Sequence, residues 1–536
     1  MKSILSEECG FVRLLRTLFL IGVLVFVTLA IGAPAVQLFK FSVMPYRDLW
    51  WHVSAADEFS RTQEFGKDPF YEHAPPFTNF GLIDLMNGSA TRVLGCQARS
   101  VCAMTFLLGE VIFLLVAFWI GWSVGGSGVA GGLSVLACWI FSKIIFPYHL
   151  ALMLVYLLYV SIWGPNNGSG KLAIRTWRET GLWGAIWRGA CLGLSFAIHP
   201  FAGTFAVLVV AISTAITYFS RVRDGTNEGN TLKILALFLV AFIVAAPWIL
   251  FQARLRPLLG AHNEHNLIPV VETWANKASY TPLLYWVALY AVLIGTAATI
   301  RRSLEWRFYM SLGLALLATF APWIFHHIAS LTSIYFPPRL PLFFPYGVVA
   351  AMMPLAMTGM WASRKKFLLA AIPILGCTLL MLVYGYRSMR VETYRLFKSE
   401  GGTPYDYLAT ELRGDWHGRC VLSDPLTSYF ARGMLGCYVI VVPAGDASAT
   451  APHTIRTQIA LDALRNGPAV LDRAGLAVDA VLLDKKRTYL PEYFSEYPGF
   501  KDFMELDYWQ VQITWSLQGW HKKMETANCI LLTRDK

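Results

Sequence analysis

The sequence predicts a polytopic α-helical membrane protein with a C-terminal α/β domain. Of its 536 residues, 56% are hydrophobic and only 15% are charged, and the mean hydropathy is +0.48. A soluble protein of this length would carry about 25% charged residues. Apolar runs long enough to span a bilayer succeed one another as far as residue 386, and none follows.

The charges flanking these runs orient about eleven predicted transmembrane helices. Lys2, Arg13 and Arg16 precede the first run, which places the N-terminus in the cytoplasm and the next segment outside. We read this run as a retained helix, because no small-residue cleavage site follows it. It ends near residue 38, and the later spans lie at 101–122, 128–146, 148–163, 185–199, 201–219, 233–251, 283–300, 308–325, 341–361 and 367–386.

The net charge of +11 fits this topology, because lysines and arginines cluster in the predicted cytoplasmic loops. No basic face or RNA-binding motif accompanies it, so we expect no nucleic-acid partner. The predicted domains are a membrane domain at 1–389, with a large first outer loop at 41–100, and an extracytoplasmic α/β domain at 390–536.

Residues 390–536 alternate short apolar segments with helical patterns, which is typical of a small α/β domain. The predicted strands are 420–423, 438–442 and 478–483, and the predicted helices are 405–412 and 454–474. Cys420 and Cys437 flank one strand turn and can form a disulfide if the domain is extracytoplasmic.

The segment 46–80 places carboxylates and imidazoles among Trp50, Trp51 and other aromatic residues. Such groups are costly to desolvate at a membrane surface, so they indicate a functional site by default. Asp48 follows the first span and can act as a general base on an acceptor hydroxyl. The alternative is a helix-capping or salt-bridging aspartate paired with Arg47 or Arg339.

Eight histidines before residue 330 are predicted at or near the outer surface, and several of them are expected to line one outward-facing cavity. Longer outer loops are the competing explanation, but they do not account for the histidines at tight helix junctions. The eight are His52, His73, His149, His199, His262, His265, His326 and His327.

The motif DLWWH, the helical stretch after it and the later DPF resemble the first outer loop of bacterial integral-membrane glycosyltransferases of the GT-C class. The matching residues are Asp48, Trp50, Trp51 and His52, then Asp68, Pro69 and Phe70. The stretch VLSDPLTSYFARGMLGCYVIVVP at 421–443 is similar to the extracytoplasmic domain of uncharacterised members of that group. The segment 46–80 and the domain 390–536, which contain these two stretches, together make up about a third of the chain.

The resemblance implies a GT-C-like fold in the bacterial inner membrane, with the C-terminal domain in the periplasm. It implies inverting transfer of a sugar from a polyprenyl-phosphate-linked donor to a glycan, lipid or protein acceptor. In this class an acidic residue just after the first span is the base, which implies Asp48. The acidic pair common in the class is absent there, and Asp57–Glu58 supplies one nine residues later, so this pair is the alternative base.

Transfer would leave a lipid phosphate, which a guanidinium binds best. Arg339 is the first candidate ligand, and a lipid-headgroup anchor is its alternative role. The other candidate substrate-binding residues are Trp50, Trp51, His52, Asp68, His73, His199, His265, His326 and His327. No cofactor is expected except, as an open alternative, a divalent cation near the HxxH of 262–265, a spacing too common to be specific.

Two other functions stay open. A transporter or flippase for a lipid-linked glycan is disfavoured because the apolar runs show no repeated halves and the span centres are read as uncharged. A non-catalytic assembly subunit would leave the activity of its pathway intact in an Asp48→Ala variant.

Overall fold

The computed structural model describes most of the first half of the chain and much of its C-terminal third. The described residues are 10–40, 47–74, 81–125, 128–141, 148–163, 181–224, 230–260, 310–315, 405, 407–412, 414–443, 451–485 and 500–534. They belong to two compact units, which are treated separately below. The helical unit is Met1–Ala35, Phe106–Leu250 and Ala278–Lys398, and the mixed unit is Val36–Thr105, Phe251–Lys277 and Ser399–Lys536.

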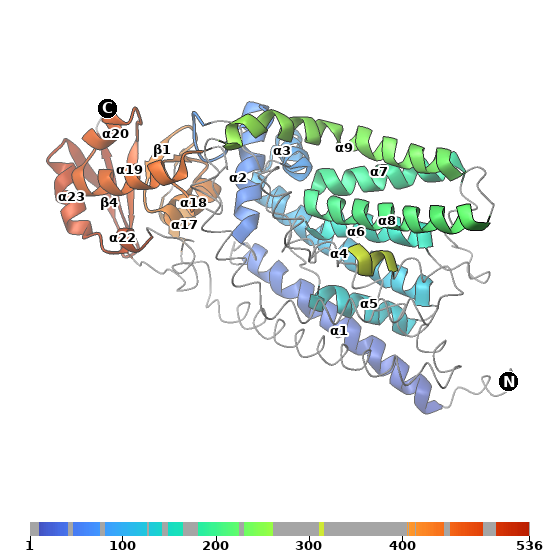
Figure 1. Ribbon diagram of the computed structural model, residues 1–536. Coiled ribbons are helices and arrows are strands. Elements are labelled where there is room, and N and C mark those ends of the chain that lie inside the picture. The colour runs from blue at the N-terminus through green and yellow to red at the C-terminus, as the bar shows by residue number, and fades with distance from the viewer. Residues whose placement is uncertain are drawn as a thin grey trace. The chain divides into compact units, whose positions relative to one another are not determined.

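Long helices occupy each predicted apolar run up to residue 251 (Figure 1). Glycine-rich or proline-containing segments separate them; for example, His199 is extended (φ −149°, ψ 107°) because Pro200 follows it. The helices are α1 (Gly10–Lys40), α4 (Ala98–Gly125), α5 (Gly128–Phe141), α6 (Tyr148–Trp163), α7 (Leu182–Ile198), α8 (Pro200–Asp224) and α9 (Asn230–Gly260).

Among the described residues, two helical segments are long and apolar enough to cross a bilayer, Ala98–Ser123 and Leu232–Phe251. Shorter apolar segments lie in α1, α5, α6, α7 and α8. Apart from a helical turn at 310–315, the spans predicted at 283–300, 308–325, 341–361 and 367–386 lie outside the described residues.

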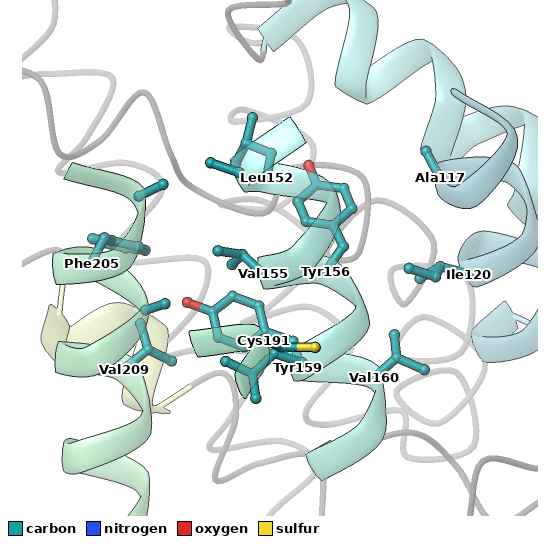
Figure 2. Close-up of a cluster of buried hydrophobic side chains, with 14 of the residues drawn as sticks. Ala117, Ile120, Leu152, Val155, Tyr156, Tyr159, Val160, Cys191, Phe205 and Val209 are labelled. Carbon is teal, nitrogen blue, oxygen red and sulfur yellow. The ribbon is translucent and has the colours of Figure 1, made fainter. Parts of the chain in front are cut away.

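Helix α6 forms the centre of the core of the helical unit (Figure 2). Tyr156 and Tyr159 are buried there, together with Phe205 of α8 and Cys191 of α7. Small residues bring other helices close: a Cβ on Gly193 of α7 would lie 2.6 Å from the Ala241 carbonyl oxygen of α9. Close backbone approach at small residues is the usual packing mode of membrane helices.

The expectation of uncharged span centres is wrong. Glu110 lies near the middle of α4, is fully buried, and neither of its carboxyl oxygens is hydrogen-bonded in the structure as described. Arg188 lies near the start of the span predicted at 185–199. It lies within α7, is 2% exposed, and donates from Nε to the Ser161 hydroxyl at 3.1 Å.

The mixed unit contains a five-stranded sheet in the order β2-β1-β3-β5-β4. Strand β1 is parallel to β2 and β3, whereas β5 is antiparallel to β3 and β4. Strands β1 (Cys420–Leu422), β2 (Tyr438–Val439) and β3 (Ala480–Asp484) overlap the predicted segments. Strands β4 (Trp520–Glu525) and β5 (Cys529–Arg534) were not predicted.

In the described part of residues 405–534, six helices accompany the sheet. The predicted helix at 454–474 is broken at Gly467, where φ is +91° and proline follows, so it forms α19 and α20. The helices are α17 (Tyr407–Glu411), α18 (Pro425–Leu435), α19 (His453–Asn466), α20 (Ala469–Arg473), α22 (Phe500–Met504) and α23 (Tyr508–Ser516).

The disulfide considered for Cys420 and Cys437 is absent, and both thiols are free. Cys420 pairs with Tyr438 in the parallel β1–β2 register. Cys437 is the residue before Tyr438 and lies outside β2.

The mixed unit also contains two helices from the predicted first outer loop, α2 (Arg47–Thr62) and α3 (Leu82–Leu94). Glycines permit close packing on both sides of α2. A Cβ on Gly88 of α3 would lie 2.8 Å from the Ala56 carbonyl oxygen, and one on Gly433 of α18 would lie 2.6 Å from the Trp50 ring. Contacts thus group the first loop with the C-terminal residues, whereas the sequence-based division assigned it to the membrane domain.

We predict that Gly433→Ala destabilises the mixed unit. The new methyl group would displace the buried Trp50 ring, and such overpacking costs about 1–3 kcal/mol, against about 1 kcal/mol of improved helix propensity. Tryptophan fluorescence during heating of the detergent-solubilised chain should show a lower unfolding midpoint. Gly22→Ala is the matched control, since no atom lies within 4 Å of its Cβ position. An unchanged midpoint for Gly433→Ala would contradict the packing described.

Candidate active site

Asp48 lies in the first turn of α2, the helix that follows α1 in the chain. Its backbone is described and its side chain is not. Of the other predicted site residues, Arg339, His265, His326 and His327 lie outside the described residues, as does His262. The site can therefore be built from α2 and the elements that hold it.

His52 lies one helical turn beyond Asp48, on the same side of α2. Its Nδ1 is 2.6 Å from Oδ1 of Asp84, and both side chains are buried. The other Asp84 oxygen accepts a hydrogen bond from the Gly81 backbone N–H at 2.7 Å, at the start of α3. A carboxylate in this position fixes the ring orientation and favours a proton on Nδ1. The pair fastens α2 to α3.

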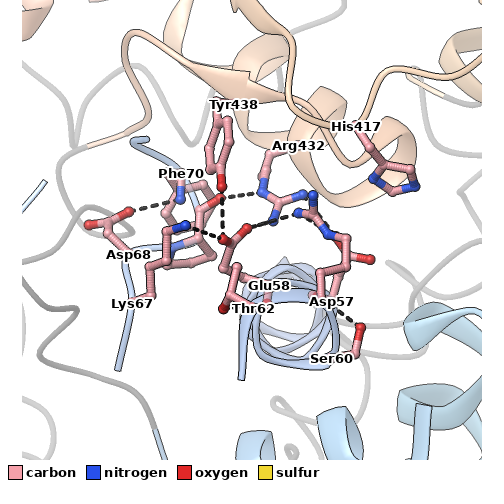
Figure 3. Close-up of polar contacts among 12 residues, drawn as sticks. Asp57, Glu58, Ser60, Thr62, Lys67, Asp68, Phe70, His417, Arg432 and Tyr438 are labelled. Atoms are coloured by element: carbon pink, nitrogen blue, oxygen red, sulfur yellow. Dashed lines mark hydrogen bonds and ion pairs between the residues drawn. The ribbon is translucent and has the colours of Figure 1, made fainter. Parts of the chain in front are cut away.

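The far end of α2 carries an ion-pair cluster with Glu58 at its centre (Figure 3). Glu58 is 1% exposed, and each carboxylate oxygen has two partners. Oε2 accepts from Arg432 at 2.9 Å and from Arg61 at 2.8 Å. Oε1 accepts from the Tyr438 hydroxyl at 2.8 Å and lies 3.2 Å from Nζ of Lys67.

Arg432 of α18 is the least exposed member of this cluster, with 0% of its side chain accessible. Its guanidinium donates to Glu58, to Asp57 Oδ2 at 3.0 Å, and through Nε to the Pro69 carbonyl oxygen. All three of its nitrogens therefore bind the segment that follows the first predicted span.

The protonation states of the cluster support these contacts. Burial lowers the pKa of Arg432, but the carboxylates of Asp57 and Glu58 raise it by more, so the guanidinium stays charged. Burial also lowers the pKa of Lys67, and Glu58 raises it above its ordinary value. Burial and the Glu58 charge together raise the pKa of Tyr438, which keeps its hydroxyl proton available for donation. Buried charges persist only when they are paired in this way.

The DPF segment folds into a turn that joins the sheet. Asp68 is fully buried, and its Oδ1 accepts from the backbone N–H groups of Phe70 and Tyr71 at 2.8 and 3.1 Å. The Phe70 carbonyl accepts from Val439 N–H of β2 at 2.9 Å. The Phe70 ring also stacks on Tyr429 of α18, with centroids 5.8 Å apart. The turn therefore extends the interaction between the first loop and β2.

The predicted substrate-binding residues lie in different surroundings. Trp50 is 1% exposed and packs against Phe430 of α18, so it is not available to stack on a sugar. Trp51 is half-buried beside His52, and His73 is exposed near Glu72. His199, in the helical unit, is the half-buried C-cap of α7.

The shared outer cavity for the histidines stays a prediction, because four of the eight lie outside the described residues. His52 and His149 are both interior side chains, and they belong to different units. His149 lies in the helical unit, edge-on to Phe106 with ring centroids 5.8 Å apart. No group of three potential metal-ligating side chains occurs in the described part of the chain.

Five residues of the site were not singled out from the sequence, namely Arg61, Lys67, Asp84, Arg432 and Tyr438. Asp84 had a local signal, since an acid three residues after Gly81 fits a helix start. Arg432 had another, as a lone cation within the apolar helix PLTSYFARGML. Neither signal identifies the partner, because Arg432 and Glu58 are 374 positions apart.

Comparison with known proteins gives matches in structure but not in sequence. No family model matches the chain, and neither does any curated protein. ArnT from Cupriavidus metallidurans, bound to undecaprenyl phosphate, is similar over 98% of each chain, with 12% identity and a TM-score of 0.49. The structural neighbours are GT-C glycosyltransferases.

Two further neighbours are matched over a smaller share of their own chains. AglB from Archaeoglobus fulgidus, in complex with an inhibitory peptide and a dolichol-phosphate, matches 92% of this chain and 72% of its own, with 15% identity and a TM-score of 0.47. The arabinofuranosyltransferase AftD from Mycobacteria matches 91% of this chain and 40% of its own, with 14% identity and a TM-score of 0.44.

We predict that Asp68 makes the stability of the mixed unit pH-dependent. Burial raises its pKa from 3.8 to about 7, although the Phe70 and Tyr71 N–H groups and the charges of Arg456 and Arg432 lower it. Between these two values the folded state binds more protons than the unfolded state. The free energy of unfolding should therefore fall as pH rises towards 7, by up to about 1.4 kcal/mol per pH unit, and then level off.

Thermal unfolding of the detergent-solubilised chain at pH 5 and pH 7.5 checks this. Asp68→Asn should flatten the difference in midpoint between the two pH values. Asp502→Asn, at an exposed position, is the control and should retain it. Equal pH dependence in wild type and Asp68→Asn would show that another group is responsible.

Proposed function

We propose that this chain is an inverting glycosyltransferase of the bacterial inner membrane, with its N-terminus in the cytoplasm and its site on the periplasmic face. The donor is a sugar linked to polyprenyl phosphate, and the acceptor is a glycan, lipid or protein of the envelope. This function is supported by the apolar composition, by the DLWWH and DPF motifs, and by the way α2 is held.

In the proposed reaction, Asp48 takes the proton of an acceptor hydroxyl while the hydroxyl oxygen attacks C1 of the sugar. The bond from C1 to the phosphate oxygen breaks, and its electron pair leaves with the lipid phosphate. Arg339, with His265, His326 and His327, is assigned to bind that phosphate, since guanidinium and imidazole groups donate well to its oxygens. Attack from the opposite side of C1 inverts the configuration.

The observation that carries this proposal is the fixed position of α2. His52–Asp84 holds the helix one turn after Asp48, and the Glu58 cluster holds its far end. A catalytic group must be held by rigid supporting contacts to reach its productive geometry. The first turn of a helix anchored at two points meets this requirement.

The same contacts favour Asp48 over Asp57 and Glu58 as the base. A general base must reach the proton that it removes. Both oxygens of the buried Glu58 are occupied by four donors, and Asp57 Oδ2 lies within 3.1 Å of both Arg61 and Arg432. We therefore assign the pair a structural role.

The contacts also separate the predicted substrate-binding residues into supporting residues and candidates for substrate contact. We assign Trp50, His52 and Asp68 to support of the site, because each is buried and engaged within the mixed unit. Trp51 and His73 remain the candidates for substrate contact in this segment. The C-terminal domain is proposed to position the acceptor.

A flippase for a lipid-linked glycan is the second candidate, and Glu110 favours it. A substrate pathway through the membrane needs polar groups within the spans, and Glu110 is a buried acid near the middle of α4. A transferase with a surface site has no need of this residue. The assay below therefore includes a transport measurement.

We predict that Asp48→Asn lowers turnover about 10²- to 10⁴-fold, the usual contribution of a general base. Purified protein would be incubated with defined polyprenyl-phosphate sugars, and release of the lipid phosphate would be followed with and without a metal chelator. Asp415→Asn, at an exposed position of the mixed unit, is the matched control and should keep wild-type turnover.

Three outcomes oppose the proposal. Wild-type turnover in Asp48→Asn, with loss in Asp57→Asn, would move the base to the acidic pair. Glycolipid crossing liposome membranes without release of lipid phosphate would favour the flippase. Absence of both activities, with pathway output intact in Asp48→Ala, would favour the assembly subunit.

A further inference from the structure

Arg432 links the first loop to the C-terminal residues through several donors. Its guanidinium reaches two side chains near the end of α2 and the backbone of the DPF turn at once. A planar guanidinium with several fixed donors specifies orientation as well as distance, which an ammonium group does not. Arg432 therefore constrains the rotation and tilt of α2.

Arg432 is itself held firmly in α18. The helix starts at Asp424, whose side chain accepts from the N–H groups of Leu426 and Thr427, and ends at Gly436 in the left-handed conformation (φ +75°). One turn of its surface meets α2 directly, because Gly433 lets the Trp50 ring lie against the helix. The contact between α18 and the first loop therefore combines side-chain packing, a hydrogen bond to the backbone and ion pairs.

The other side of α2 is held by α3 in the same unit. His52 bonds to Asp84, and Gly88 lets the α2 backbone approach closely. The helix is clamped between α3 and α18, and a rotation that breaks the Arg432 contacts must also disturb the His52 pair. Glu58 lies ten residues from Asp48, about 15 Å along the helix, so a small tilt about the clamp moves the first turn.

We propose that Arg432 is a positioning residue for catalysis: through Glu58 and Asp57 it fixes α2 so that Asp48 meets the acceptor hydroxyl. The inference rests on the proposed function. Misplacement by about 1 Å can cost 10²-fold in rate, so loss of Arg432 should act on the chemical step. Donor binding, assigned to residues elsewhere, should change little.

The first experiment measures kcat and the donor KM for Arg432→Gln, Arg432→Lys and Glu58→Gln, each corrected for the folded fraction. Arg432→Gln should lower kcat at least tenfold with donor KM within about twofold. Arg432→Lys should recover only part of the loss, since an ammonium cannot bind both carboxylates and the turn. Arg473→Gln, an exposed arginine of α20, is the control. Arg432 and Glu58 should couple non-additively in the double variant, because they share one interaction.

The second experiment measures the local stability of α2 and does not depend on activity. Amide hydrogen exchange over 47–62 should accelerate in Arg432→Gln and stay unchanged in Arg473→Gln. If the wild type is inactive but exchange over 47–62 is faster in Arg432→Gln, the proposed function is rejected, while the role of Arg432 in holding α2 is supported. An active wild type whose Arg432→Gln variant keeps both kcat and slow exchange would overturn the positioning role. Reduced yield of folded protein with normal kcat would overturn it as well, leaving a merely structural arginine.

Discussion

The buried ion pair between Glu58 and Arg432 is the interaction on which the mixed unit depends. Neither side chain can leave its partner without exposing a charge to an interior that cannot solvate it. The pair therefore fixes both of the segments that carry it, although they are 374 positions apart in the chain. Around it, the DPF turn pairs with β2 and the Trp50 ring lies against α18. One ionic contact thus organises the region that contains Asp48.

Grouping by contacts and division by composition place the first loop differently. Composition separates an apolar N-terminal part from a charged C-terminal part, and the sequence-based domains follow that boundary. The contacts group residues 47–105 with the sheet instead. A segment that is remote in sequence from the C-terminal domain is then part of its fold, and the candidate base belongs to the same unit as its supports.

Short-range sequence patterns predicted the helices and strands whose formation depends mainly on neighbouring residues. Apolar runs located α1 and α4–α9, and short apolar segments located β1, β2 and β3. The break between α19 and α20 was missed, although Gly467–Pro468 is a recognisable helix end. The spacing of Cys420 and Cys437 in the sequence did not show that both thiols are free.

Non-local contacts also limited what the sequence could predict of the site. The motif drew attention to Asp48, His52, Asp57, Glu58 and Asp68, but it could not separate structural from chemical roles. That separation depends on Arg432, Tyr438 and Asp84, whose contacts with α2 and the DPF turn are non-local. The four donors that surround the Glu58 carboxylate cannot be recognised from the sequence, because three of them lie outside the helical turn that carries it or far along the chain.

The most direct test of this account is an experimental structure of the chain in a lipid nanodisc with a non-transferable polyprenyl-phosphate sugar analogue and an acceptor. The account predicts the Asp48 carboxylate within hydrogen-bonding distance of the acceptor hydroxyl, with the Glu58 contacts to Arg432 and Tyr438 intact. A complex in which Asp48 faces lipid, or in which Glu58 has left Arg432 to contact the sugar, would contradict it.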